Sequence, residues 1–70
     1  MNGNRKYRIL YPTMEKAIRS KGTIQKFLEA TELSENAYYK VITGMVAPRK
    51  TTIDRILSYT GLTYEEAFYE

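Results

Sequence analysis

The stretch that decides the fold reads TIQKFLEATELSENAYYKVIT and covers residues 23–43. Its apolar side chains recur at the three- and four-residue spacing that marks one face of a helix. In the first half these positions are Ile24, Phe27 and Leu28, and in the second half they are Ala37, Tyr38 and Val41. The spacing predicts two short helices, over residues 23–30 and 34–43.

The residues in front of each apolar stripe support the same interpretation. Thr23 and Ser34 belong to the residue types whose side chains accept a hydrogen bond from the free N–H groups of a helix N-terminus. About three residues, Thr31 to Leu33, are left between the two helices. Two short helices joined by so tight a turn have the dimensions of a DNA-binding helix-turn-helix.

Helical punctuation continues on both sides of this stretch. Pro12 opens and Gly22 closes a first helix, and a fourth helix runs from a cap at Thr51 or Thr52 to Gly61. A capping-box pattern over residues 63–66 begins a short fifth helix. The alternation of a strand is hard to find. The sequence therefore predicts an all-α fold, a compact bundle of about five short helices, with one domain over residues 10–70 and a flexible basic arm over residues 1–9.

Composition argues against several classes of function. The chain of 70 residues contains neither cysteine nor histidine, so it lacks cysteine zinc ligands and the usual general base. We expect no enzyme activity, no cofactor, no metal site and no small-molecule ligand. No apolar run approaches the roughly 20 residues that cross a bilayer, and the basic N-terminus leads into no signal-peptide core. We therefore expect a cytoplasmic protein without a membrane partner.

The net charge of +3 is unevenly distributed along the chain. Through Lys26 one acid, Glu15, stands against seven basic residues: Arg5, Lys6, Arg8, Lys16, Arg19, Lys21 and Lys26. From Thr51 onward one base stands against four acids: Asp54, Glu65, Glu66 and Glu70. Such polarity suits a domain that presents one face to a polyanion, although a chance imbalance explains it equally well.

Residues 21–35 and 40–44, together with Pro48, the helix over 52–59 and residues 61–68, resemble the lambda-repressor/Cro-like (XRE) family of phage and bacterial regulators. The resemblance covers about residues 10–68. It implies a sequence-specific, double-stranded-DNA-binding transcriptional regulator of phage or mobile-element origin. It also implies pairing of two domains on a palindrome, so a weak homodimer is a further expected partner. Tyr59, Phe68 and Tyr69, near or on the last helix, supply apolar surface for it, although Phe68 fits closing the core equally well.

The resemblance also assigns roles to particular residues. Tyr38 and Val41 match inward positions of the recognition helix. Base contacts are expected from four residues of that helix, Glu35, Asn36, Tyr39 and Lys40. Phosphate contacts are expected from five residues, Gln25, Lys26, Thr43, Arg49 and Lys50.

Three positions depart from the family pattern. Leu28 stands where relatives favour alanine, and Ile24 stands where strict alignment places a phosphate-binding glutamine, which here follows as Gln25. Glu32 stands where relatives favour a turn glycine, so it has to adopt a positive φ angle.

Other interpretations of these residues stay open. Asn36 and Lys40 also fit plain solvated side chains, and Glu35 fits a role in supporting its helix N-terminus. The N-terminal basic residues fit either an arm along DNA or a soluble tail. The alternative function is a protein-interaction module on a helix-turn-helix scaffold that binds another regulator or an antitoxin-like partner, because the recognition helix carries little positive charge.

Overall fold

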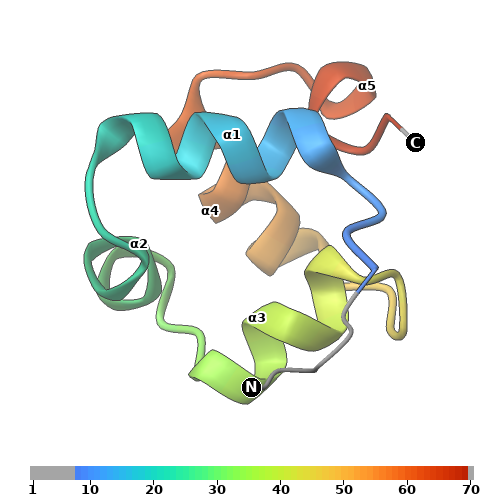
Figure 1. Cartoon of the computed structure of the whole chain (residues 1–70), viewed down its shortest axis with the longest axis horizontal. Coiled ribbons are helices and arrows are strands. Elements are labelled where there is room, and N and C mark those ends of the chain that lie inside the picture. The colour runs from blue at the N-terminus through green and yellow to red at the C-terminus, as the bar shows by residue number, and fades with distance from the viewer. Residues whose placement is uncertain (1–7, 70) are drawn as a thin grey trace.

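Residues 8–69, the part of the chain that the computed structural model describes, form five α-helices and no strand (Figure 1). The helices are α1 (Pro12–Lys21), α2 (Ile24–Thr31), α3 (Glu35–Ile42), α4 (Lys50–Thr60) and α5 (Tyr64–Ala67). The predicted all-α bundle of five short helices is confirmed.

The helices are arranged around α4. It packs against α1, α2 and α5. Figure 1 shows α1 and α5 on one side of the molecule and α3 on the opposite side, with α2 to the side of both. The helix that the sequence assigns to recognition therefore lies at one end of the bundle, away from the short acidic α5.

The core forms where the apolar stripes meet. Phe27 and Tyr38 are almost fully buried, and their rings meet edge to face with centroids 5.5 Å apart. Such aromatic pairs contribute about 0.5–1.5 kcal/mol beyond their buried area. Ile18 from α1 and Ile56 from α4 complete this centre. The predicted inward positions Tyr38 and Val41 are both buried, with 2% and 4% of their surface exposed.

Side-chain caps fix where several helices begin. The hydroxyl of Thr23 accepts a hydrogen bond from the Lys26 N–H, and that of Ser34 accepts one from the Ala37 N–H, both at 3.1 Å. At α5 the Thr63 hydroxyl and the Glu66 carboxylate form both halves of a capping box. These three predicted helix starts are confirmed.

The predicted start of α4 is wrong. The helix begins at Lys50, and Arg49 occupies the N-cap with extended backbone angles (φ −70°, ψ 160°) and no side-chain cap bond. The Arg49 carbonyl already accepts the first helical bond, from the Ile53 N–H at 2.9 Å. The threonines expected to cap, Thr51 and Thr52, are thereby placed inside the first turn.

The turn between α2 and α3 contains the unusual backbone conformation expected from the sequence. Glu32 is the C-cap of α2 in the left-handed region, with φ 61° and ψ 34°. Its carboxylate pairs with the Arg55 guanidinium at 3.3 Å, which ties the turn to α4. Leu28, the bulky departure from the family pattern, is buried in the core with 8% exposure.

The segment before α1 packs on the end of α3. The Leu10 N–H donates to the Ile42 carbonyl at 2.8 Å. Gly44 has φ 78°, and a Cβ built there would lie 2.2 Å from Leu10 Cδ2. The backbone angle therefore favours glycine at this position, and a Cβ there would also displace the end of the Leu10 side chain. Of the predicted basic arm, Arg8 and Ile9 are exposed, and residues 1–7 lie outside the described part.

Among the helices of residues 8–69, none has both the length and the apolar character needed to cross a bilayer. The same residues contain no group of three or more acidic, histidine or cysteine side chains placed to hold a metal ion.

Candidate functional site

The outward face of α3 carries a short polar ridge. Asn36 and Lys40 are exposed and stand four residues apart, so they are one helical turn from each other. Burial of Tyr38, Val41 and Ile42 on the opposite face fixes this orientation. Within residues 8–69 the side chains of Asn36 and Lys40 make no hydrogen bond or ion pair, so their polar groups are available to a ligand. We call these two residues the α3 ridge.

Each side of the α3 ridge is bordered by a hollow. A groove of about 370 Å³ separates α3 from the loop before α4 and from the start of α4. It is lined by the α3 ridge and by Leu33, Ser34, Ala37, Val41, Val46, Ala47, Pro48, Arg49 and Thr52. A smaller hollow on the other side is lined by the α3 ridge with Tyr39, Thr43 and Met45. The structure thus places five of the nine predicted site residues around these two hollows: Asn36, Tyr39, Lys40, Thr43 and Arg49.

Tyr39 and Thr43 are half-buried at the edge of that region. The Tyr39 ring meets the Tyr38 ring edge to face at a centroid distance of 5.1 Å. The Thr43 hydroxyl donates to the Tyr39 carbonyl at 2.6 Å. This bond leaves the lone pairs of the hydroxyl oxygen to accept from a ligand, while its proton is already engaged.

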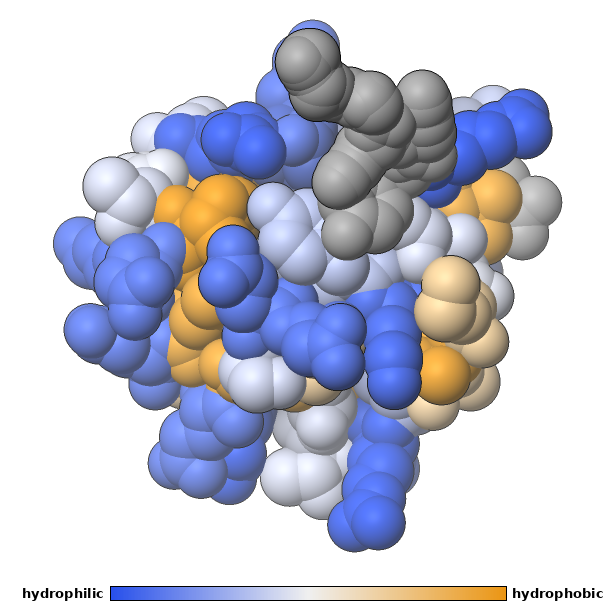
Figure 2. Space-filling model, turned by 60° about the horizontal axis from the view of Figure 1, so that its bottom comes forward, coloured by the Kyte–Doolittle hydropathy of each residue, from blue (hydrophilic) through white to orange (hydrophobic). Residues whose placement is uncertain are grey.

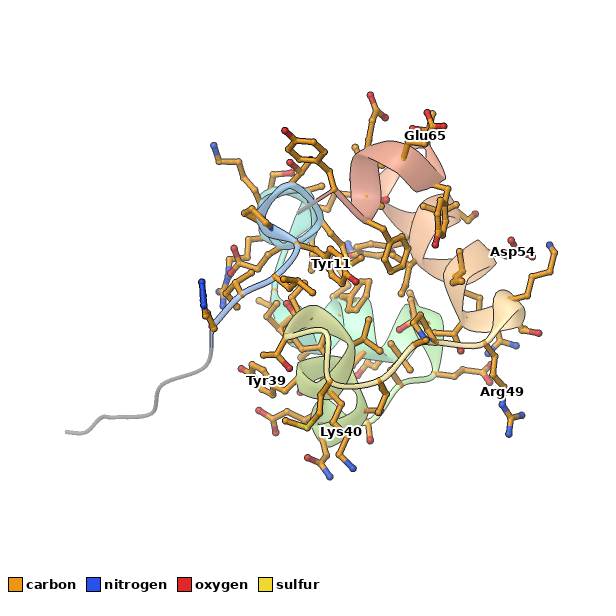
Figure 3. All side chains as sticks on the ribbon, turned by 90° about the vertical axis from the view of Figure 1, so that its right-hand side faces the viewer. Tyr11, Tyr39, Lys40, Arg49, Asp54 and Glu65 are labelled. Atoms are coloured by element: carbon orange, nitrogen blue, oxygen red, sulfur yellow. The ribbon has the colours of Figure 1, made fainter. Side chains whose placement is uncertain are left out.

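Two cations stand at the start of α4, beside the larger groove. Arg49 is exposed and reaches away from the molecule at the same end as Lys40 (Figure 3). Lys50 pairs with Asp54 at 3.2 Å, with side-chain exposures of 87% and 62%. So exposed an i, i+4 pair contributes little, and a phosphate competes with it readily. Glu65 lies at the opposite end of the molecule.

Besides Lys50, three predicted site residues line neither hollow. Glu35 is exposed in the first turn of α3, where its charge also suits the helix N-terminus. Gln25 and Lys26 are exposed in the first turn of α2. The structure therefore does not place these three residues in either hollow.

Sequence reasoning missed the apolar loop beside the α3 ridge. Met45 is 70% exposed and Val46 is 44% exposed. Figure 2, in which the α3 end is turned forward, shows hydrophilic side chains over the middle, with apolar surface both to the left of them and at the right. The signal was present in the sequence as an apolar run, Met45 to Ala47, in a loop that follows a glycine.

Behind the α3 ridge, burial changes the acidity of one core side chain. Burial raises the pKa of the Tyr38 hydroxyl to about 12, and the charge of the Glu15 carboxylate acts in the same direction. The same carboxylate, hydrogen-bonded to the Arg19 guanidinium, raises the pKa of Arg19. Both shifts keep the ordinary charge states in place at neutral pH, so they fit a structural role.

Comparisons with protein-family models, with characterised proteins and with solved structures found no match to this chain.

Proposed function

We propose that this protein is a sequence-specific, double-stranded-DNA-binding transcriptional regulator of the lambda-repressor/Cro-like kind, of phage or mobile-element origin. The observation that carries the proposal is the α3 ridge: the side chains of Asn36 and Lys40 are exposed, make no hydrogen bond or ion pair within residues 8–69, and are flanked by Arg49. A short helix of this size fits the major groove when its outward side chains reach base edges.

The chemistry of the ridge suits bases, and that of its surroundings suits phosphates. An asparagine pairs with N6 and N7 of adenine, and a lysine reaches O6 and N7 of guanine. Tyr39 and Glu35 add hydrogen-bonding groups beside them, and a glutamate accepts from cytosine N4. Phosphates would be contacted by residues at the margins, which are Gln25, Lys26, Thr43, Arg49 and Lys50; such contacts supply affinity without sequence preference.

Alanine substitutions separate these two roles. Asn36→Ala and Lys40→Ala should each weaken binding to a selected duplex by about 1–3 kcal/mol and leave binding to a scrambled duplex nearly unchanged. Arg49→Ala and Lys50→Ala should weaken binding to both duplexes alike. Titrations by fluorescence anisotropy measure all four effects. Lys16→Ala is the matched control, because it removes the same charge from α1 on the other side of the bundle.

A second candidate is a protein-interaction module on the same scaffold. It is favoured by the exposed Met45 and Val46 and by Glu35, whose charge offsets that of Lys40 on α3. If the chain binds no duplex, or if Asn36→Ala and Lys40→Ala leave the affinities for both duplexes unchanged, this candidate takes precedence over DNA reading.

A weak homodimer remains a prediction. Of the three residues expected to supply its surface, only Tyr69 is largely exposed, at 67%. Tyr59 is half-buried, and the half-buried Phe68 ring contacts Tyr11 at a centroid distance of 5.1 Å. Phe68 therefore closes the core, which leaves Tyr69 as the exposed member of the expected surface. Light scattering of the chain, free and on a palindromic duplex, measures whether a dimer forms.

A further inference from the structure

An apolar side chain stands exposed beside the hydrogen-bonding residues of the α3 ridge. Val46 keeps 44% of its surface in contact with solvent, although exposed apolar surface lowers stability in water. The larger groove places it with Ala37, Val41, Ala47 and Pro48. One wall of a groove whose rim is polar and cationic is thus built from methyl and methylene groups.

The backbone fixes Val46 relative to the α3 ridge. The N–H groups of Met45 and Val46 both donate to the Lys40 carbonyl, at 2.8 and 3.2 Å. Pro48 follows two residues later, and its ring restricts the backbone of the residue before it. Lys40 and Val46 also line the same groove, so a ligand seated in that groove can contact both side chains.

We propose that this apolar wall receives the 5-methyl group of thymine, and that Val46 is a specificity-determining residue for it. The inference rests on the proposed DNA binding. The cations Lys40 and Arg49 on the groove rim complement a polyanion. Within the major groove the thymine methyl is the one apolar group among base-edge donors and acceptors. A valine side chain in the loop beside the reading helix therefore matches the thymine methyl better than the polar edges of the other bases.

Deoxyuridine tests this contact, because it lacks only the 5-methyl group and keeps the base-pairing pattern of thymine. The full chain is first used to select a preferred duplex from a randomised pool. Each thymine of that duplex is then replaced singly by deoxyuridine, and affinities are measured for the original protein, Val46→Ala and Met45→Ala. Met45→Ala is the matched control, because Met45 lies in the same loop but borders the other hollow.

At one thymine we expect replacement by deoxyuridine to weaken binding by the original protein about fourfold. This is the loss in affinity that corresponds to the roughly 0.8 kcal/mol of one buried methyl group. The same replacement should have little effect on Val46→Ala and an undiminished effect on Met45→Ala. Circular dichroism checks that both variants are folded. Both keep the backbone N–H groups that bond to Lys40.

Three results would overturn the inference while leaving DNA binding established. They are a selected duplex without thymine, no effect of deoxyuridine at any position, and a methyl effect that persists in Val46→Ala or disappears in Met45→Ala. Failure to select or bind any duplex would instead remove the proposed function, and the thymine contact with it.

Discussion

Glu32 occupies a backbone conformation that costs most residues free energy. Its φ of 61° lies in the left-handed region, where a Cβ is crowded. The Glu32 carboxylate offsets part of this cost through its ion pair with the Arg55 guanidinium. The Glu32 side chain is 73% exposed and the Arg55 side chain is 43% exposed. A pair so open to solvent contributes about 0–1 kcal/mol, so the backbone and side-chain effects are of similar size.

Glu32→Gly should have a free energy of unfolding about 0.5–1 kcal/mol higher than Glu32→Ala, because both variants lose the ion pair and only glycine adopts the left-handed conformation without strain. Glu32→Ala is the control: it removes the same ion pair but keeps the Cβ, so it should be no more stable than the original protein. Urea denaturation measures both. A glycine variant less stable than the alanine variant would show that the strain is absent.

Because the Tyr38 hydroxyl is buried, we expect the protein to lose stability at alkaline pH. Burial raises its pKa in the folded protein from 10.0 to about 12. Because the pKa is higher in the folded state than in the unfolded state, the neutral Tyr38 hydroxyl contributes its full share of the folding stability below pH 10. That contribution is lost as the pH rises towards 12. Tyr38→Phe should therefore gain stability relative to the original protein between pH 10 and 12, while its ring still packs on Phe27. Tyr64→Phe removes an exposed hydroxyl and should follow the original protein, and thermal melts across this range decide the point.

At this scale the sequence predicted what depends on local chemistry. The positive φ of Glu32 was implied by the resemblance, which places a turn glycine at this position, whereas the caps Thr23 and Ser34 follow from residue type and spacing. The start of α4 did not, because Arg49 acts as N-cap through its backbone alone, and a cap without a side-chain bond leaves no signature in the sequence. Val46 was missed because its exposure depends on how the loop folds back onto Lys40.

At the scale of the elements, α2 and α4 both end on a buried threonine. The Thr31 hydroxyl donates to the Phe27 carbonyl at 2.8 Å, and the Thr60 hydroxyl donates to the Ile56 carbonyl at 2.9 Å. Each hydroxyl is satisfied within its own helix. The two differ in one respect, since the Thr60 oxygen also accepts a bond from the Leu62 N–H at 3.3 Å.

Replacement of each threonine by valine, which has the same shape, separates these cases. Thr31→Val should change the free energy of unfolding by less than about 0.5 kcal/mol, because removal of an internally paired hydroxyl leaves no donor without a partner. Thr60→Val should cost about 1–3 kcal/mol, because the half-buried Leu62 N–H loses its acceptor. Chemical denaturation of the pair measures the difference. Equal costs would show that the bond to Leu62 contributes nothing.

The existence and order of the helices were predictable because apolar periodicity, caps and glycines agree along the chain. The packing of one helix on another was not. That Leu10 approaches Gly44, and that Arg55 reaches back to Glu32, depends on contacts between segments distant in sequence. Periodicity contains no information on such pairs.

For the whole molecule, the distribution of charge predicts how binding depends on salt. Lys40 and Arg49 lie at one end and Glu65 at the other (Figure 3). With about four to six phosphate contacts, the logarithm of the affinity for duplex DNA should fall against the logarithm of salt concentration with a slope of roughly −4 to −5. Arg49→Ala should reduce the slope by about one. A slope near zero would mean that phosphates supply none of the affinity.

The freedom of the α3 ridge from internal bonds has an evolutionary consequence. Tyr38, Val41 and Ile42 hold α3 in the core, and Leu10 secures its last turn, whereas Asn36 and Lys40 contribute to neither. Under the proposed function, mutations at these two positions can drift without a loss of foldability. A lineage can therefore acquire a new target sequence by one or two substitutions, with the scaffold inherited intact.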